Sequence, residues 1–190
     1  DIPQEIGQLE RLEKLDLSTN RLIQLPEAIG ELATLRYLRA QTNSLTSLPQ
    51  SLSNLSQLRE LNVSNNQLAS LTAATGGLEK LERLLLHDNQ IATIPASIQE
   101  MPSLSFLNLS SNALNTFPQE VWNLPRLDSL DLSLNQISTL PTLTDKDGTL
   151  PLRYLNLSSN KLTVLPDEIN KLGRLVSLNI QSNSLRELPK

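Results

Sequence analysis

The chain has 190 residues, enough for one domain with a sizeable core. Aromatic residues make up only 3% of it against 38% hydrophobic residues overall, so the interior must be built almost entirely from Leu, Ile and Val. A net charge of -4 without any basic run argues against a nucleic-acid binder, and the lack of cysteine excludes disulfides, thiolate metal sites and a cysteine nucleophile.

The first predicted element is the second half of a repeating unit. In residues 1–11, Pro3, Ile6 and Leu9 follow the spacing that returns at residues 26–32. No polar cap is recognisable at either end of the chain, although solenoids need caps over their terminal apolar faces. We therefore expect the chain to be a piece of a longer protein.

The next element is a short strand followed by a turn. Residues 14–18 alternate polar and apolar side chains, which predicts a strand with Leu15 and Leu17 facing inward. Asn20 then turns the chain out of the strand. Its amide can donate and accept hydrogen bonds, and so can satisfy backbone groups that would otherwise be buried unpaired.

The unit closes with a return segment. Pro26 is predicted to open a short helical turn as its first residue, because proline fixes its own backbone angle. Ile29 and Leu32 are three residues apart and should both point into the core. Since this side is bulkier than the strand side, the stack of units should curve with the strands on its concave face.

The same unit recurs eight times. The asparagine of the turn returns every 23 residues, with a single spacing of 25 before the seventh copy. These asparagines are Asn20, Asn43, Asn66, Asn89, Asn112, Asn135, Asn160 and Asn183. Such regular phasing predicts a solenoid of stacked coils.

The unit reads L-x-x-L-x-L-x-x-N-x-L-x-x-L-P-x-x-I-x-x-L and resembles the leucine-rich repeat over essentially the whole chain. Its length and its Leu-Pro step are similar to the intracellular Ras-suppressor-like and Scribble-type group and to bacterial and protozoan arrays. The resemblance implies an α/β solenoid, a right-handed curved superhelix. Its concave face would be a parallel sheet of about eight short strands, with short helical or irregular turns on the convex side. We expect a single array over residues 1–190, with a partial repeat at 1–11 and then eight repeats.

Two units depart from the pattern. Residues 71–78 lack the proline and place Thr75 where Ile is usual, so this return segment is expected to be less well packed. Residues 142–151 contain a two-residue insertion that should bulge from the convex side. Within it, residues 145–148 resemble the start of a calcium loop, but the later acidic ligands are missing and a turn is favoured.

The outward strand positions are the place to seek function, because the framework leucines are committed to the core. Most of these positions are small and polar, but the second and fourth repeats differ. In-register stacking should bring their side chains together with neighbours from the third and fifth repeats, in a patch rich in residue types found at interface hot spots. The candidate partner-binding residues are Tyr37, Arg39, Glu60, Arg83, Leu85, His87 and Phe106. The alternative is ordinary surface variation.

Two single residues need separate interpretation. His87 is the only histidine, so a histidine-cluster metal site is impossible. A catalytic role for His87 would need a nucleophile and an orienting acid around it, and Asp88 is only its sequence neighbour.

Trp122 on the return side is expected to lie across neighbouring leucines or to mark a convex contact. We expect no catalytic residue and no metal site.

The resemblance implies protein binding, commonly as a scaffold in signalling. The alternative is the recognition or targeting arm of a GTPase, cyclase, kinase or ubiquitin ligase whose catalytic domain lies outside this chain. The expected partner is a protein, with no cofactor, no small-molecule substrate and no nucleic acid. The chain contains no apolar run near the roughly 20 residues that span a bilayer, and it begins without a signal peptide. Together with the absence of cysteine, this favours a cytoplasmic location without membrane insertion.

Overall fold

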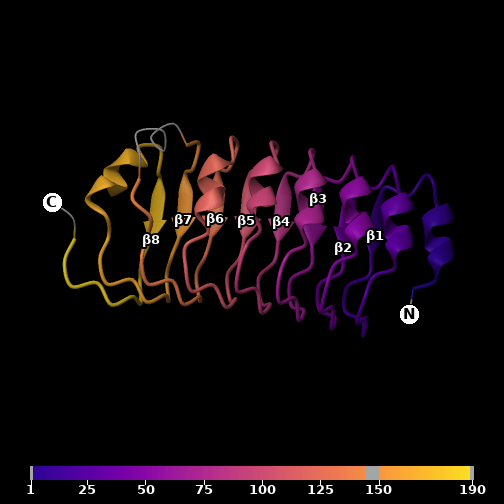
Figure 1. Ribbon diagram of the computed structural model, residues 1–190, viewed down its shortest axis with the longest axis horizontal. Helices are drawn as coiled ribbons and strands as arrows, with labels where there is room; N and C mark the ends of the chain where they lie inside the picture. Colours follow the sequence, from indigo (N-terminus) through magenta and orange to yellow (C-terminus); the bar gives the residue numbers. More distant parts are fainter. Residues whose placement is uncertain (1, 144–149, 189–190) are drawn as a thin grey trace.

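The computed structural model describes residues 2–143 and 150–188 and contains one open sheet of eight parallel strands, paired in chain order (Figure 1). The strands are β1 (Lys14–Asp16), β2 (Tyr37–Arg39), β3 (Glu60–Asn62), β4 (Arg83–Leu85), β5 (Phe106–Asn108), β6 (Ser129–Asp131), β7 (Tyr154–Asn156) and β8 (Ser177–Asn179). Each is three residues long, but backbone pairing continues beyond it: the amides of Leu17 and Thr19 donate to the carbonyls of Arg39 and Gln41. The expected fold class, a leucine-rich-repeat-type solenoid with a parallel sheet, is confirmed.

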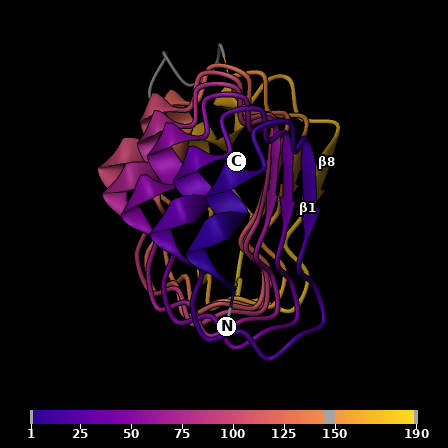
Figure 2. The same ribbon diagram turned by 90° about the vertical axis from the view of Figure 1, so that its right-hand side faces the viewer.

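Short 3₁₀ helices lie on the side of the coils opposite the strands (Figure 2). They are η1 (Gln4–Gln8), η2 (Glu27–Glu31), η3 (Gln50–Asn54), η4 (Ala73–Gly77), η5 (Ala96–Glu100), η6 (Gln119–Asn123) and η8 (Asp167–Lys171). The prediction that Pro26 is the first helical residue is wrong by one position. Pro26 has an extended ψ of 152° and precedes η2, while its carbonyl accepts the hydrogen bond from Ile29 that closes the turn.

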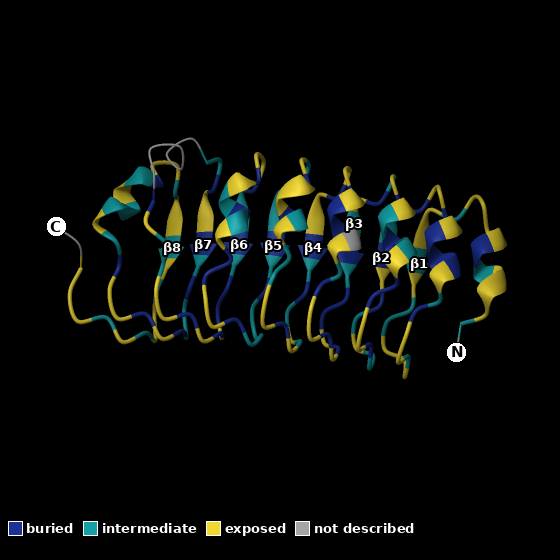
Figure 3. Ribbon diagram, in the orientation of Figure 1, coloured by how far each residue is buried: buried dark blue, intermediate teal, exposed yellow. Residues whose placement is uncertain are grey.

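The core is one continuous aliphatic cluster that runs through the coils, and buried segments recur from one coil to the next (Figure 3). Leu61 and Leu107, the central residues of β3 and β5, are fully buried in it, and Leu15 of β1 is half-buried against it. On the return side, Ile29 and Leu32 are fully buried, as their spacing predicts. The predicted inward positions therefore share one interior.

The recurring asparagine ties each coil to the one before it. Asn43 donates through Nδ2 to the carbonyl of Ala40 in its own turn and to that of Leu17 in the preceding coil, and its Oδ1 accepts from the amide of Leu22. Later coils repeat this arrangement, and three of these asparagines are buried: Asn66, Asn135 and Asn160. The predicted role of the side chain in satisfying buried backbone groups is confirmed.

Residues 71–78, which were expected to pack less well, bury Oγ1 of Thr72 without a hydrogen-bond partner among the described residues. Thr75 is fully buried and its hydroxyl donates to the carbonyl of Thr72, so the polar atom does not disturb the core. A Cβ at Gly76 would lie only 2.8 Å from Cβ of Ser97 in η5, which shows how closely the two helices approach. Glycine allows this approach because it has no side chain. The insertion expected within 142–151, including the turn at 145–148, falls mainly on 144–149, outside the described residues.

Candidate functional site

The strand face, meaning the outward side chains of β1 to β8, brings the predicted patch together in two rows. The first row pairs Tyr37 with Glu60, Glu60 with Arg83 and Arg83 with Phe106. The second pairs Arg39 with Asn62, Asn62 with Leu85 and Leu85 with Asn108. The register predicted from the 23-residue spacing is confirmed.

Glu60 lies at the centre of the patch and binds an arginine on each side. Its Oε1 accepts from Nε of Arg39 at 2.9 Å, and its Oε2 lies 3.6 Å from Nε of Arg83. The Glu60 side chain is only 15% exposed, whereas those of Arg39 and Arg83 are 48% and 46% exposed. The two cations therefore face solvent above a carboxylate that is largely covered.

Both aromatic side chains of the patch are half-buried beneath a cation. The Arg83 guanidinium lies 4.2 Å from the ring centroid of Phe106, and Nζ of Lys14 lies 5.3 Å from that of Tyr37. Such cation–π contacts hold the cation in place over the ring face. The sequence-based hypothesis treated the two rings as exposed contact groups, but they act first as platforms for Arg83 and Lys14.

Lys14 and Asp16 were not among the predicted site residues, although they extend the patch onto β1. Together with Leu15, Tyr37 and Arg39 they line a hollow of about 340 Å³ on the strand face. The hydrogen bonds that Asp16 accepts from the side chain and the amide of Ser18 keep the pKa of this carboxyl below its ordinary value, and nearby Arg39 adds to the effect. The position of Lys14, which shares the first row with Tyr37, could have revealed this extension.

A recurring side-chain clip explains why the remaining strand positions offer less to a partner. In β3 and its following turn, Oδ1 of Asn62 accepts hydrogen bonds from both the amide and the hydroxyl of Ser64. The same clip joins Asp16 to Ser18, Asn108 to Ser110 and Asp131 to Ser133. These polar groups are already satisfied within their own strand.

The clip is interrupted at the second and fourth repeats. There the two positions are held by Arg39 with Gln41, and by Leu85 with His87. Within the described part of the chain, Oε1 of Gln41 is a buried polar atom without a hydrogen-bond partner. The strands on either side of the clipped strand β3 thus carry larger side chains at these two positions, among them Arg39 on β2 and Leu85 on β4.

His87 does contact its neighbour, since its Nδ1 lies 2.8 Å from Oδ2 of Asp88. Ladder hydrogen bonds place Ser64 and Ser110 beside it in register. Both hydroxyls, however, donate to asparagine Oδ1 atoms of their own strands, so their protons are directed away from the imidazole. A base and an acid are present without an aligned nucleophile, which is not the geometry of nucleophilic catalysis.

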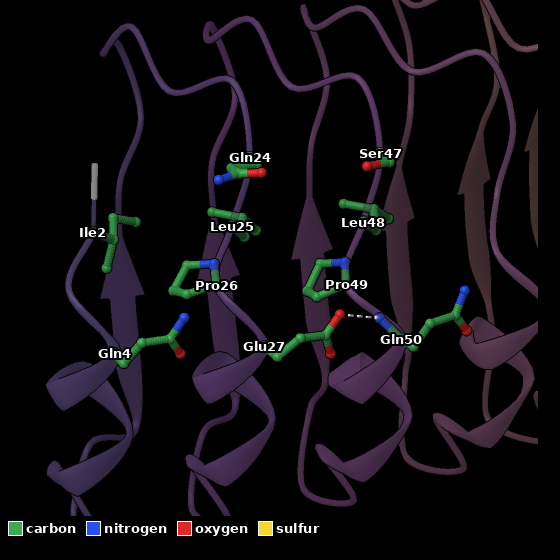
Figure 4. A pocket seen from close by; sticks show the side chains of 10 residues that line it. All are labelled: Ile2, Gln4, Gln24, Leu25, Pro26, Glu27, Ser47, Leu48, Pro49 and Gln50. Carbon is green, nitrogen blue, oxygen red and sulfur yellow. Dashed lines mark hydrogen bonds between the residues drawn. The ribbon is translucent and has the colours of Figure 1, made fainter.

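The return side carries a second hollow of about 320 Å³, which was not expected from the sequence (Figure 4). Its lining includes Gln4, Glu27 and Gln50, which occupy equivalent positions in successive coils. Oε1 of Gln4 accepts from the amide of Ala28, and Oε1 of Glu27 accepts from the amide of Gln50, so the side chains of Gln4 and Glu27 serve contacts between coils. Further along, Trp122 is half-buried and stacks on Phe117, with ring centroids 4.6 Å apart.

Across residues 2–143 and 150–188, no three or more histidine, aspartate or glutamate side chains are grouped so that they could hold a metal ion. None of the helices in the same ranges is both long and apolar enough to cross a bilayer.

Comparison with known families gives matches along nearly the whole chain. A model described as "Leucine-rich repeat region" matches residues 1–84 and 27–140, and one described as "Leucine rich repeat" matches residues 125–185. A search of curated proteins finds no significant match.

Similar solved structures include a leucine-rich-repeat protein of Leptospira interrogans, with 30% identity and a TM-score of 0.62 over 98% of this chain. A plant peptide hormone receptor, RGFR1 in complex with RGF2, is 27% identical with a TM-score of 0.73 over 98% of this chain. TLR13 in a complex with a single-stranded RNA is 28% identical with a TM-score of 0.85 over 97% of this chain. The present chain spans 65%, 34% and 27% of these three chains, less than two thirds of each.

Proposed function

The chain belongs to the leucine-rich-repeat family, and on this basis we propose that it is a protein-interaction module whose partner docks on the concave strand face. The contact residues are Tyr37, Arg39, Glu60, Arg83, Leu85, His87 and Phe106. One observation carries the proposal: the full clip of β1, β3, β5 and β6 is absent at β2 and β4, where even the amide hydrogen bond that β7 and β8 retain is lost. Groups able to contact a partner are thereby gathered in one patch.

A protein partner fits this patch better than a nucleic acid does. Its exposed surface mixes Leu85 and half-buried rings with arginines, the combination found at protein-interface hot spots. The chain as a whole carries a net charge of -4, which would repel a polyphosphate. RNA binding by the similar TLR13 structure makes nucleic acid the alternative to test.

The repeat type and the composition also support a particular branch of the family and a cellular location. The 23-residue unit with its Leu-Pro step supports placement in the Ras-suppressor-like and Scribble-type group, and the lack of cysteine supports a cytoplasmic scaffold in signalling. We also propose that residues 1–190 act as one array. The chain spans less than two thirds of each similar structure named above, which leaves room for the second candidate: a recognition arm joined to a catalytic domain.

The test is the quadruple change Tyr37→Ala, Arg83→Ala, Leu85→Ala and Phe106→Ala in a chain used for quantitative affinity capture. Proteins retained by the wild-type chain should bind the quadruple variant at least about tenfold more weakly, because each hot-spot truncation removes a substantial share of the binding free energy. A matched control changes outward positions at the other end of the same sheet, Ser129→Ala, Tyr154→Ala and Ser177→Ala, together with Arg153→Ala at the exposed residue just before β7. Both variants must keep the wild-type melting temperature.

If the first variant retains its partners with wild-type affinity, the strand-face patch is not the binding site. If the control variant loses the partners instead, the site lies on β6 to β8. An oligonucleotide retained more tightly than any protein would favour the nucleic-acid alternative.

A further inference from the structure

The patch lacks one negative charge. Arg39 and Arg83 share a single carboxylate, that of Glu60, and both contact it through Nε. We propose that the partner supplies the missing charge: an acidic side chain, Asp or Glu, of the partner protein docks between the two guanidinium groups above Glu60. This inference rests on the proposed function and specifies the chemistry that the patch recognises.

The edges of the guanidinium groups point to this assignment. Nε of Arg39 donates to Glu60, and Nε of Arg83 lies 3.6 Å from the same carboxylate, so neither printed contact uses the terminal nitrogens of the two groups. Among the described residues these nitrogens make no hydrogen bond, and each arginine side chain is nearly half exposed. Terminal guanidinium nitrogens form a planar pair of donors that matches the two oxygens of a carboxylate.

The arginines are also held in position before any partner arrives. Glu60 is mostly covered and restrains both side chains from below, and the Phe106 ring lies 4.2 Å under the Arg83 guanidinium. A partner carboxylate would therefore meet donors that have already lost part of their rotamer freedom. Preorganisation of this kind lowers the entropy that binding must overcome.

The charges around the pair have the sign that the proposal needs. Lys14 over the Tyr37 ring adds a third cation beside Arg39. The opposing charge is Asp16, whose Oδ1 is engaged by Ser18. Within the two rows on β1 to β4, three cations thus face two carboxylates, Asp16 and Glu60, while the carboxylate of Asp88 lies outside the rows and contacts His87. A surplus of one positive charge suits one acidic side chain and is too small for the many phosphates of a nucleic acid.

The experiment uses a random peptide library displayed on phage and selected against the whole chain. Peptides selected by the wild-type chain should be enriched in Asp or Glu at one position. Selection against the double change R39E and R83E should enrich Lys or Arg at that position. The control R153E with R174E alters net charge equally and should keep the wild-type preference; Arg153 is a close match because it also lies over an aromatic ring, that of Tyr154, near the carboxylate of Asp128.

The best peptide is then synthesised with its acidic residue and with the neutral amide in its place. The change from Glu to Gln should weaken binding to the wild-type chain about tenfold, and should have little effect on binding to a chain carrying R39A and R83A. An oligouridylate measured beside the peptide reports any recognition of phosphate.

Several outcomes would overturn the inference. A peptide consensus without acidic residues would show that the patch does not recognise a carboxylate. An acidic preference that persists in the R39E and R83E chain would show that the arginine pair is not the cause of that preference. If an oligouridylate binds more tightly than the peptide and through the same arginines, the group that the arginine pair recognises is a phosphate and not a carboxylate. If peptides show no acidic preference but bind more weakly to a chain with Tyr37 and Leu85 changed to Ala, the inference fails while the proposed function stands. If no peptide is selected, or if binding ignores every strand-face change, both fail.

Discussion

At the scale of single residues, the recurring asparagine offsets a local strain in each coil. The residue before it adopts a left-handed backbone conformation in all eight repeats, with φ between 52° and 58°. Residues other than glycine adopt this conformation at a free-energy penalty of about 1–2 kcal/mol. The hydrogen bonds of the asparagine side chain to its own turn and to the preceding coil hold this turn in place.

The role of the asparagine can be measured at Asn112. Replacement by alanine removes donation to the carbonyls of Leu86 and Leu109 and leaves the amide of Ile91 without its acceptor. We expect the free energy of unfolding, measured by urea denaturation, to fall by about 1–3 kcal/mol. Asn20→Ala is the control, because Asn20 is exposed and its hydrogen bonds to Leu17 and Ser18 stay within its own turn.

The control should therefore have the smaller effect. Equal losses for Asn20→Ala and Asn112→Ala would show that contacts between coils add nothing to the role of the asparagine. The asparagine itself was predictable from its spacing, but the left-handed residue before it was not. That position holds Thr19, Asn65, Leu134 and other residue types in different repeats, so no shared glycine marks it.

At the scale of elements, each 3₁₀ helix leaves amides at its start that need acceptors. The start of η3 is capped by the preceding coil: the Glu27 carboxylate accepts from the amide of Gln50 at 3.1 Å and from that of Ser51 at 2.8 Å. Pro49, which precedes the helix, provides no side-chain cap. Glu27 thus joins η2 to η3 on the return side, as the asparagine joins coils near the strands.

This cap makes part of the stability depend on pH. The hydrogen bonds from Ser51, that of its amide first, keep the pKa of Glu27 below its ordinary value in the folded chain. A carboxyl whose pKa is lowered by folding contributes stability above its unfolded pKa of about 4.3, and that contribution is lost as pH falls through the folded pKa. Glu27→Gln should therefore lower the melting temperature at pH 7 and have much less effect at pH 3.

The measurement is the melting temperature of wild-type and Glu27→Gln chains between pH 3 and pH 7. Glu187→Gln, at an exposed carboxylate, is the charge-matched control. A difference between wild type and Glu27→Gln that stays constant over this range would contradict the cap. The capping role was hard to predict from sequence because it joins residues 23 and 24 positions apart. The proline that marks most return segments is also no requirement, as η4 forms after Thr72 without it.

At the scale of the whole molecule, the regular phase of the repeats made most of the arrangement predictable. The rows containing Tyr37, Glu60 and Arg83 follow from the 23-residue spacing alone, because strands stacked in register align equivalent residues. The contacts that the side chains make within the rows could not be predicted from the spacing. That Glu60 serves two arginines, and that Phe106 lies under one of them, depends on side-chain rotamers, which the spacing does not fix.

The same architecture predicts how changes in the core combine. Leu84 and Leu107 are fully buried partners on adjacent strands, so truncating both to alanine opens cavities that adjoin. Their effects on the free energy of unfolding should differ from a simple sum by about 0.5–3 kcal/mol. Leu38 on β2 and Leu130 on β6 are equally suited to truncation, but three strands, β3 to β5, separate them.

At a strand spacing of about 4.8 Å, Leu38 and Leu130 lie roughly 19 Å apart, too far to share a cavity. In a solenoid each coil contacts only its neighbours, so their effects should add within about 0.5 kcal/mol. Urea denaturation of the four single and two double variants gives both coupling energies. The continuous aliphatic core leads us to expect that stability passes from coil to coil through nearest-neighbour contacts. Strong coupling between Leu38 and Leu130, or none between Leu84 and Leu107, would contradict this expectation.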